Sequence, residues 1–243
     1  MFLKSPNLPK EKVGSVLIDY RAEHAFKNLQ ELGINVYKTP ELNIAYPAVA
    51  GHPDMLFHIL DSKNAIVAPE VFSYFKNLFG ETIVLGFSKI GNTYPHDVAY
   101  NIARIGNFAF HNVKYTDTTI NEYYKQNGVK LINVKQGYSK CSICIVSENA
   151  FITADKKIAE TAQKHEIDVL LIREGYVKLK GFSHGFIGGA SGLISGEMLV
   201  FNGDISKHPD YKSINNFCAK HGVEVVSLNK NDLEDIGSII PLF

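Results

Sequence analysis

Two neighbouring stretches, "YTDTTINEYYKQNGVKLINVKQGYSK" (115–140) and "TADKKIAETAQKHEIDVLLIREGYVK" (153–178), align with each other without a gap. The offset between them is 38 residues throughout. The matched positions are Asp117 with Asp155, Ile120 with Ile158, and Gly137-Tyr138 with Gly175-Tyr176. An internal repeat of this length predicts a fold built from equivalent supersecondary units.

The second stretch, read with the residues before it, indicates the structure of one unit. Ile143 to Val146 and Ala150 to Thr153 are short β-branched or apolar runs typical of strands. Asp155 can cap a helix that carries apolar residues at helical spacing, Ile158, Ala159 and Ala162. The run "DVLLIREG" then predicts a returning strand. Each unit is therefore expected to be ββαβ.

The same order recurs with looser spacing along the whole chain and predicts five units. The expected helices are 20–32, 69–79, 118–127, 155–165 and 210–221. The first unit lacks an opening strand, and the C-terminal "IGSIIPLF" is a strand without a helix after it, so the last strand is expected to complete the first unit. The prediction is an α/β propeller with pseudo-fivefold symmetry, closed by that strand. An open α/β sheet remains the alternative, because it produces the same alternation of elements.

Composition limits the classes of function. With 243 residues and 45% hydrophobic residues, the chain is expected to form a single domain over 1–243. Lys and Arg equal Asp and Glu at 25 each, without charged blocks, so neither a nucleic acid nor a membrane is an expected partner. No signal peptide or long apolar span is visible, and three cysteines are an odd number, so a cytoplasmic protein with reduced thiols is predicted.

Polar residues gather where the opening strands should face the centre of the ring. These segments are "AGHPDMLF", "YNIARIG", "GYSKCSIC" and "FIGGASGLI". In an extended segment residues i and i+2 point the same way, so His52 and Asp54 would share one cavity. An imidazole beside a carboxylate suits proton transfer next to a bound cation. Taken singly, a capping histidine and a turn aspartate remain the alternatives.

The cysteines allow several interpretations. Cys141 and Cys144 form a C-x-x-C, but the motif runs into a strand and has no second ligand pair, which argues against redox and zinc sites. In a strand the two side chains point to opposite faces, so Cys141 can face the centre while Cys144 and Cys218 belong to the core. Ser191 lacks the G-x-S-x-G context of a serine nucleophile.

These residues resemble the pentein, or guanidino-group-modifying, superfamily, which includes arginine deiminases, dimethylarginine dimethylaminohydrolases and amidinotransferases. "HPDMLF" (52–57) is similar to an H-x-D-x-x-F segment of its deiminases, and "GYSKC" (137–141) to a G-x-x-R-C segment with the nucleophilic cysteine. The cysteine falls two units after the histidine, as in the family. The order of the units around the ring is thus the same as in the family, although this chain begins at a different unit of the ring. Small bacterial proteins of this fold without an assigned activity look similar.

The resemblance implies five ββαβ units and a hydrolase that acts on a guanidino compound through a covalent thiouronium. It implies Cys141 as nucleophile, His52 as acid and base, and Asp54 as a guanidinium ligand, with no metal or organic cofactor. Further substrate-binding candidates, chosen by their place at the unit openings, are Asn101, Arg104, Lys140, His184, Gly189 and Asp235. The alternative is a non-catalytic pentein that acts as a binding or sensor protein. Exposed outer helices are compatible with a homodimer.

Overall fold

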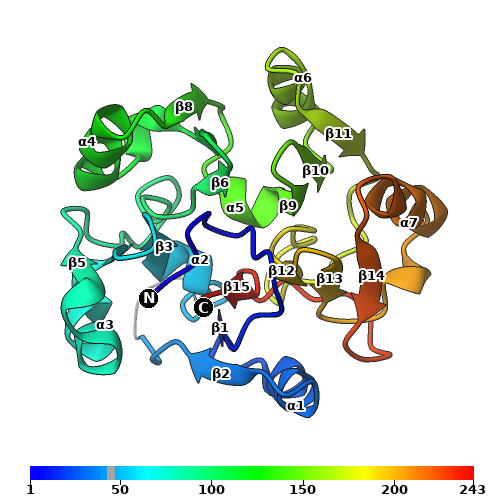
Figure 1. Ribbon diagram of the computed structural model, residues 1–243, viewed down its shortest axis with the longest axis horizontal. Coiled ribbons are helices and arrows are strands. Elements are labelled where there is room, and N and C mark those ends of the chain that lie inside the picture. The colour runs from blue at the N-terminus through cyan, green and yellow to red at the C-terminus, as the bar shows by residue number, and fades with distance from the viewer. Residues whose placement is uncertain (43–46) are drawn as a thin grey trace.

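The computed structural model describes residues 1–42 and 47–243. Five separate three-stranded sheets surround a central axis, and one long helix accompanies each sheet on the outside (Figure 1). In each sheet the inner strand is antiparallel to the middle strand. The outer strand follows the helix and runs parallel to the middle strand. The predicted ββαβ units are therefore confirmed, and separate small sheets rule out the open-sheet alternative.

The long helices agree with the expected ranges to within a few residues. Apolar side chains at helical spacing pack each of them against its own sheet, as Ile158, Ala159 and Ala162 do in the fourth unit. Asp155 caps that helix by accepting hydrogen bonds from the backbone N–H groups of Lys157 and Ile158, as predicted. The long helices are α1 (Glu23–Glu31), α3 (Phe72–Phe79), α4 (Thr118–Gln126), α6 (Lys156–Gln163) and α7 (Tyr211–Lys220).

The strands are short and, toward the axis, largely buried. The strands nearest the axis are β15 (Ile240–Pro241), β3 (Phe57–Ile59), β6 (Ala103–Ile105), β9 (Cys144–Ser147) and β12 (Ser191–Ser195). The middle strands are β1 (Ser15–Ile18), β4 (Ala65–Val67), β7 (Phe108–His111), β10 (Ala150–Thr153) and β13 (Met198–Phe201). The outer strands are β2 (Asn35–Lys38), β5 (Ile83–Leu85), β8 (Lys130–Asn133), β11 (Asp168–Leu171) and β14 (Glu224–Ser227).

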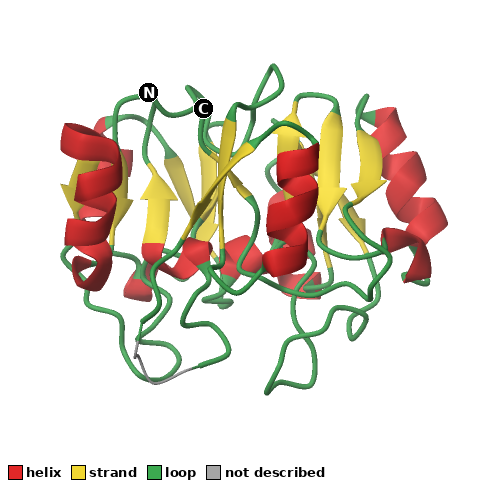
Figure 2. Ribbon diagram, turned by 90° about the horizontal axis from the view of Figure 1, so that it is seen from below, coloured by secondary structure: helices red, strands yellow, loops and turns green. Residues whose placement is uncertain are grey.

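The C-terminal strand closes the ring. β15 pairs antiparallel with β1, with Val16 opposite Pro241 and Leu17 opposite Ile240. The first unit therefore takes its inner strand from the other end of the chain, as the sequence predicted. Both termini lie at one end of the strands, and the longest loops extend from the other end (Figure 2).

Short helices complete the structure at the inner strands. α2 (Pro53–Leu56) immediately precedes β3, and α5 (Ser139–Ser142) ends just before β9. Four single 3-10 turns lie elsewhere in the described chain, at Pro69–Val71, Gly80–Thr82, Val113–Tyr115 and Ile205–Lys207. Among the described residues no helix is both long and apolar enough to cross a bilayer.

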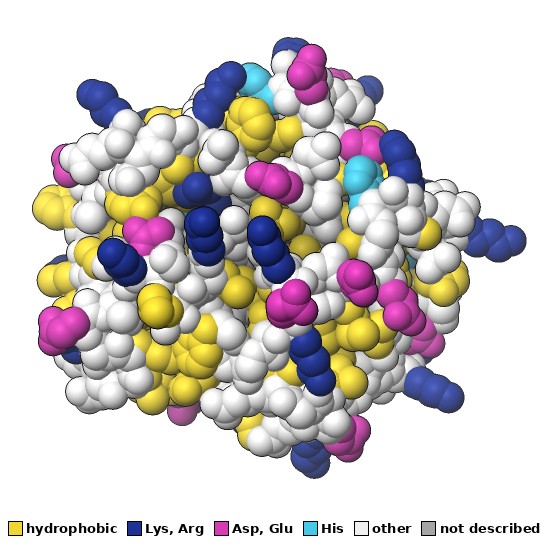
Figure 3. Space-filling model, in the orientation of Figure 1, with side chains coloured by type: hydrophobic (Ala, Val, Ile, Leu, Met, Phe, Trp, Pro, Cys, Tyr) yellow, Lys and Arg dark blue, Asp and Glu magenta, His cyan; other side chains and the backbone are white. Residues whose placement is uncertain are grey.

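The N-terminal residues cross the centre of the ring at the end where the termini lie (Figure 1). The backbone N–H of Leu3 donates to Leu242, and that of Val13 donates to Ile194. The Asn7 amide donates to the backbone carbonyl of Arg104. Charges of both signs are scattered over this face, without a block of either sign (Figure 3).

Candidate functional site

His52 and Asp54 are positioned by the short helix α2. His52 is its N-cap residue, and Pro53 stands at the first helical position, where its backbone angle and missing N–H suit a helix start. The expectation of an extended segment was therefore wrong: Asp54 lies in the first helical turn. Both side chains are nevertheless buried, with 1% of each residue exposed.

Cys141 also lies on a helix rather than on the predicted strand. It belongs to α5, and its thiol is buried. Cys144 is the first residue of β9 and is fully buried in the core, as is Cys218 on α7. As predicted, Cys141 lies at the centre of the ring while Cys144 and Cys218 lie in the core. Cys141 is separated from Cys144 because it lies on the helical turn α5, and not because side chains alternate along a strand.

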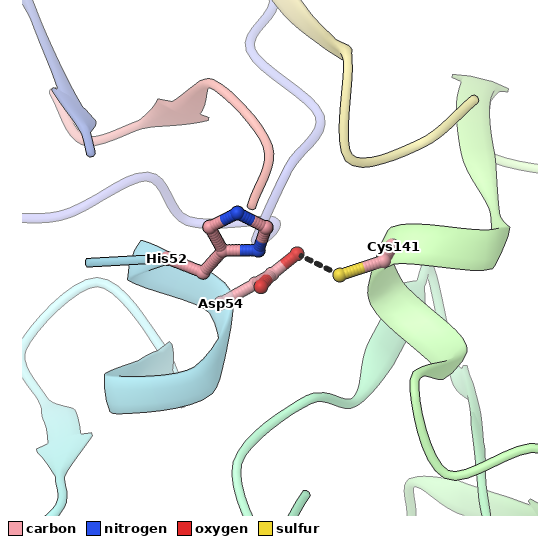
Figure 4. Close-up of side chains that lie close together, drawn as sticks. All are labelled: His52, Asp54 and Cys141. Atoms are coloured by element: carbon pink, nitrogen blue, oxygen red, sulfur yellow. Dashed lines mark hydrogen bonds between the residues drawn. The ribbon is translucent and has the colours of Figure 1, made fainter. Parts of the chain in front are cut away.

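The tertiary structure brings His52, Asp54 and Cys141 together (Figure 4). The Cys141 thiol donates a hydrogen bond to Oδ2 of Asp54 across 3.0 Å. One polar atom from each of the three side chains lies within 4.8 Å of the other two. Such an imidazole, carboxylate and thiol set also matches the donors that zinc prefers in proteins, so among the described residues these three could hold a metal ion.

Asn101 anchors the cysteine. Its amide nitrogen donates to Cys141 Sγ across 3.2 Å, and its side-chain oxygen accepts from the backbone N–H groups of Lys140 at 2.8 Å and Cys141 at 3.3 Å. Asn101 is fully buried just before β6, in the neighbouring unit. It thus sets the position of both the α5 backbone and the thiol.

Asp235 supplies a second buried carboxylate. Its Oδ1 lies 3.8 Å from Nδ1 of His52. Backbone N–H groups of Phe186 and Gly237 donate to it at 2.9 Å. Gly189 lies directly against this carboxylate, which would collide with a Cβ atom at that position. Among the sequence candidates, Asp235 and Gly189 therefore lie at the same site as His52.

Lys140 is linked to Asp54 through the hydroxyl of Ser238. Its ammonium donates to the Ser238 hydroxyl across 2.9 Å, and that hydroxyl donates to Oδ2 of Asp54 across 2.8 Å. Ser238 was not among the sequence candidates. The signal for it was available, because "GS" immediately precedes the strand that closes the ring, the position that holds polar residues in the other units.

Burial dominates the electrostatics of the site. It raises the pKa of the Cys141 thiol well above its usual value, and the charges of Asp54 and Asp235 add to this effect. Burial likewise raises the pKa of Asp235, against the opposing effect of His52. Burial lowers the pKa of Lys140, while Asp54 counteracts that shift. The thiol is therefore protonated at neutral pH as long as no cation occupies the site.

A narrow cavity of about 180 Å³ opens over these groups. Its most deeply buried lining residues, Cys141, His52 and Asp235, form its base, and the more exposed Tyr138, Phe182, Ser183, His184 and Phe186 are among its walls. A wider cavity of about 610 Å³ shares His52, Leu179, Phe182 and Asp235 with it. The sequence candidate His184 therefore lines the same cavity as the thiol.

Arg104 is the sequence candidate that the structure places elsewhere. It lies on β6, where its Nε donates to the carbonyl of Gly106 across 2.6 Å and its guanidinium covers the ring of Tyr124 at 5.3 Å. It lines neither of the two cavities at His52. Ser191 is buried, with its hydroxyl 3.3 Å from the carbonyl of Gly188.

Known structures share the fold. DDAH from Pseudomonas aeruginosa, a cysteine-to-serine mutant complexed with citrulline, superposes with a TM-score of 0.60 at 9% identity, over 96% of this chain and 100% of that chain. Inosamine-phosphate amidinotransferase from Streptomyces griseus has a TM-score of 0.58 at 11% identity, with 100% and 97% covered. An amidinotransferase of the saxitoxin pathway of Microseira wollei has a TM-score of 0.52 at 12% identity, with 93% and 91% covered.

These similarities establish the pentein fold that the sequence resemblance implied. No curated protein matches the sequence. Residues 17–240 match a sequence family described as "Family of unknown function (DUF6873)". Because that match spans most of the chain, this protein is a member of the DUF6873 family.

Proposed function

We propose that the protein is a cysteine-dependent hydrolase of a small guanidino compound. One observation carries the proposal: the Cys141 thiol lies 3.0 Å from the Asp54 carboxylate and beside His52, at the base of a cavity. A nucleophile, an acid and base, and a ligand for a cation are thus within reach of one bound molecule. The DDAH structure holds citrulline, a urea derivative like the product of the proposed reaction, which supports this chemistry for the fold.

A guanidinium is planar and cationic, and Asp54 and Asp235 would bind its nitrogens as charge-assisted hydrogen-bond acceptors. Its charge counteracts the two carboxylates that raise the pKa of Cys141, so substrate binding itself favours the thiolate. In the free protein Cys141 would then remain an unreactive thiol, and it would become a thiolate only when the cationic substrate binds.

The Cys141 thiol would transfer its proton to His52, and the resulting thiolate would attack the central carbon of the guanidinium and form a C–S bond. His52 protonates the departing nitrogen as the C–N bond breaks, which leaves a covalent thiouronium on Cys141. His52 then accepts a proton from water, whose oxygen forms a C–O bond with the same carbon as the C–S bond breaks. Overall one water is consumed, one amine or ammonia is released, and a urea derivative leaves the restored thiol.

The test is a screen of guanidino compounds for release of ammonia or amine. The wild type and Cys141→Ser are compared, with Cys218→Ala as the control because this cysteine is buried on α7 outside the site. We expect turnover in the wild type and the control, none in Cys141→Ser, and an adduct on Cys141 after acid quench. Turnover by Cys141→Ser, or a panel with neither turnover nor adduct, would refute the proposal.

A further inference from the structure

The walls of the narrow cavity differ sharply from its base. Val49, Tyr138, Leu179, Phe182 and Phe186 make up most of the walls, and three of these five side chains are aromatic. Three ionisable groups, Cys141, His52 and Asp235, lie at the buried base, and His184 is the ionisable side chain in the walls. A ligand that fills this cavity therefore has one polar end and an apolar remainder.

The polar end is suited to a cation. Asp235 lines the base, and Asp54 lies directly behind the thiol. The ammonium of Lys140 is hydrogen-bonded to Ser238 on the far side of Asp54 and does not line the cavity. Aromatic rings in the walls favour a delocalised cation further, because their faces carry negative partial charge.

The remainder of the ligand meets no cationic partner. Among the described residues, no lysine or arginine lines the narrow cavity. In the wider cavity, Arg21 is bound to Asp19 through two nitrogens and also donates to the carbonyls of Pro47 and Ala48. Lys180, at the same wider cavity, is exposed to water. His184, in the walls, has its Nδ1 3.1 Å from the carbonyl oxygen of Gly185. A carboxylate carried into the narrow cavity would therefore be desolvated without a lysine or arginine partner, which is strongly unfavourable.

The volume limits the size of the ligand. An apolar cavity of about 150 Å³ is known to accept benzene, which has six heavy atoms. The cavity of about 180 Å³ is slightly larger. It therefore has room for a guanidinium and a substituent of a few carbons.

We infer that the site selects small guanidines with an apolar N-substituent over guanidino acids such as arginine. This inference rests on the proposed function and specifies its substrate class. Butylguanidine and 4-guanidinobutyrate make a matched pair, since the terminal methyl of the first is a carboxylate in the second.

Binding tests the inference without requiring turnover. Calorimetry with Cys141→Ser is expected to give a Kd for butylguanidine at least about tenfold lower than that for 4-guanidinobutyrate. The kcat/KM ratio of the wild type should favour butylguanidine by a similar factor. Equal or reversed affinities, or no binding of either compound, would overturn the inference.

A variant can reverse the selectivity. Leu179 lines both cavities, so Leu179→Arg places a guanidinium beside the bound substituent and should raise the affinity for 4-guanidinobutyrate relative to butylguanidine at least about tenfold. Leu85→Arg is the matched control, because Leu85 is half exposed on the outer strand β5 and lines neither cavity. If the relative affinity for the two compounds changes in both variants, or in neither, the assignment of Leu179 to the cavity wall is contradicted.

The two hypotheses fail separately. If Cys141→Ser prefers butylguanidine but the wild type releases neither ammonia nor amine from any guanidine, the substrate class stands as a ligand class and the hydrolase is refuted. If the wild type turns over 4-guanidinobutyrate or arginine faster than butylguanidine, the hydrolase stands and the inferred selectivity is wrong.

Discussion

The sulfur of Cys141 lies 3.0 Å from Oδ2 of Asp54, although 87 residues separate them in the chain. A buried thiol that donates to a carboxylate is held in its protonated form. In the proposed reaction the same carboxylate binds a cationic substrate, whose charge would release the thiol proton. The relationship therefore ties the reactivity of the cysteine to occupation of the site.

Asp54→Asn should separate thiol reactivity from turnover. Removing the charge lowers the pKa of Cys141, so alkylation of this cysteine by iodoacetamide speeds up near neutral pH. Turnover should fall at least about a hundredfold, because the guanidinium loses a ligand. Peptide mass spectrometry across a pH series measures the first effect, with Asp232→Asn on the surface as control. Slower alkylation in Asp54→Asn would contradict the electrostatic account.

Asn101→Ala should act on the thiol in the opposite direction. The Asn101 amide donates to Cys141 Sγ and lowers the pKa of the thiol, so its loss raises that pKa and slows alkylation. Because Asn101 also holds the α5 backbone, kcat should fall more than KM changes. Asn112→Ala, at a partly exposed amide that donates to the carbonyl of Lys135, is the control. An unchanged pH profile of alkylation would limit Asn101 to a structural role.

Gly189→Ala should displace Asp235. The new Cβ collides with the Asp235 carboxylate, and the backbone there is tied by hydrogen bonds from Ile236 and Ser238, so the carboxylate has to move away from His52. We expect destabilisation of about 1–3 kcal/mol and a clear loss of kcat. Gly14→Ala, where the Cβ meets only an ordinary contact, is the control in thermal unfolding and steady-state assays. Full activity of Gly189→Ala would show that the position of Asp235 is unimportant.

Two buried histidines should make the fold sensitive to acid. Burial lowers the pKa of His58 to about 3 and that of His111 to about 4, below the usual 6.5. At a pH below 6.5 but above the lowered pKa, each histidine is protonated in the unfolded chain and neutral in the folded chain. Stability is therefore full above pH 6.5 and falls as the pH drops toward 4, by about 1.4 kcal/mol per pH unit for each histidine.

His58→Gln tests this account, because glutamine can replace the hydrogen bond of His58 to the Tyr124 hydroxyl but does not titrate. Urea unfolding between pH 7 and 4.5 should show a shallower loss of stability in this variant than in the wild type. His24→Gln, on the exposed side of α1, should follow the wild type. Parallel curves for all three proteins would exclude His58 as a source of the acid sensitivity.

The local pattern of the sequence determined most of the fold. Apolar periodicity and the 38-residue repeat predicted five helices, and the unpaired strand at the C-terminus predicted closure of the ring. These features are readable because strands and helices impose periods of 2 and 3.6 residues on the chain. The same ring order predicted that His52 and Cys141 lie at one centre, and the resemblance of their motifs predicted their pairing with Asp54.

Only the tertiary structure decided the details of the site. Asp54 and Cys141 lie on short helices, where four-residue segments have too little periodicity to be recognised. Ser238 and Asp235 meet Lys140 and His52 because β15 completes the first sheet, whereas Arg104, chosen by the same reasoning, faces Tyr124 instead. Sequence patterns carry information about neighbours along the chain. Contacts between units depend on how the closed ring aligns them, which no single segment encodes.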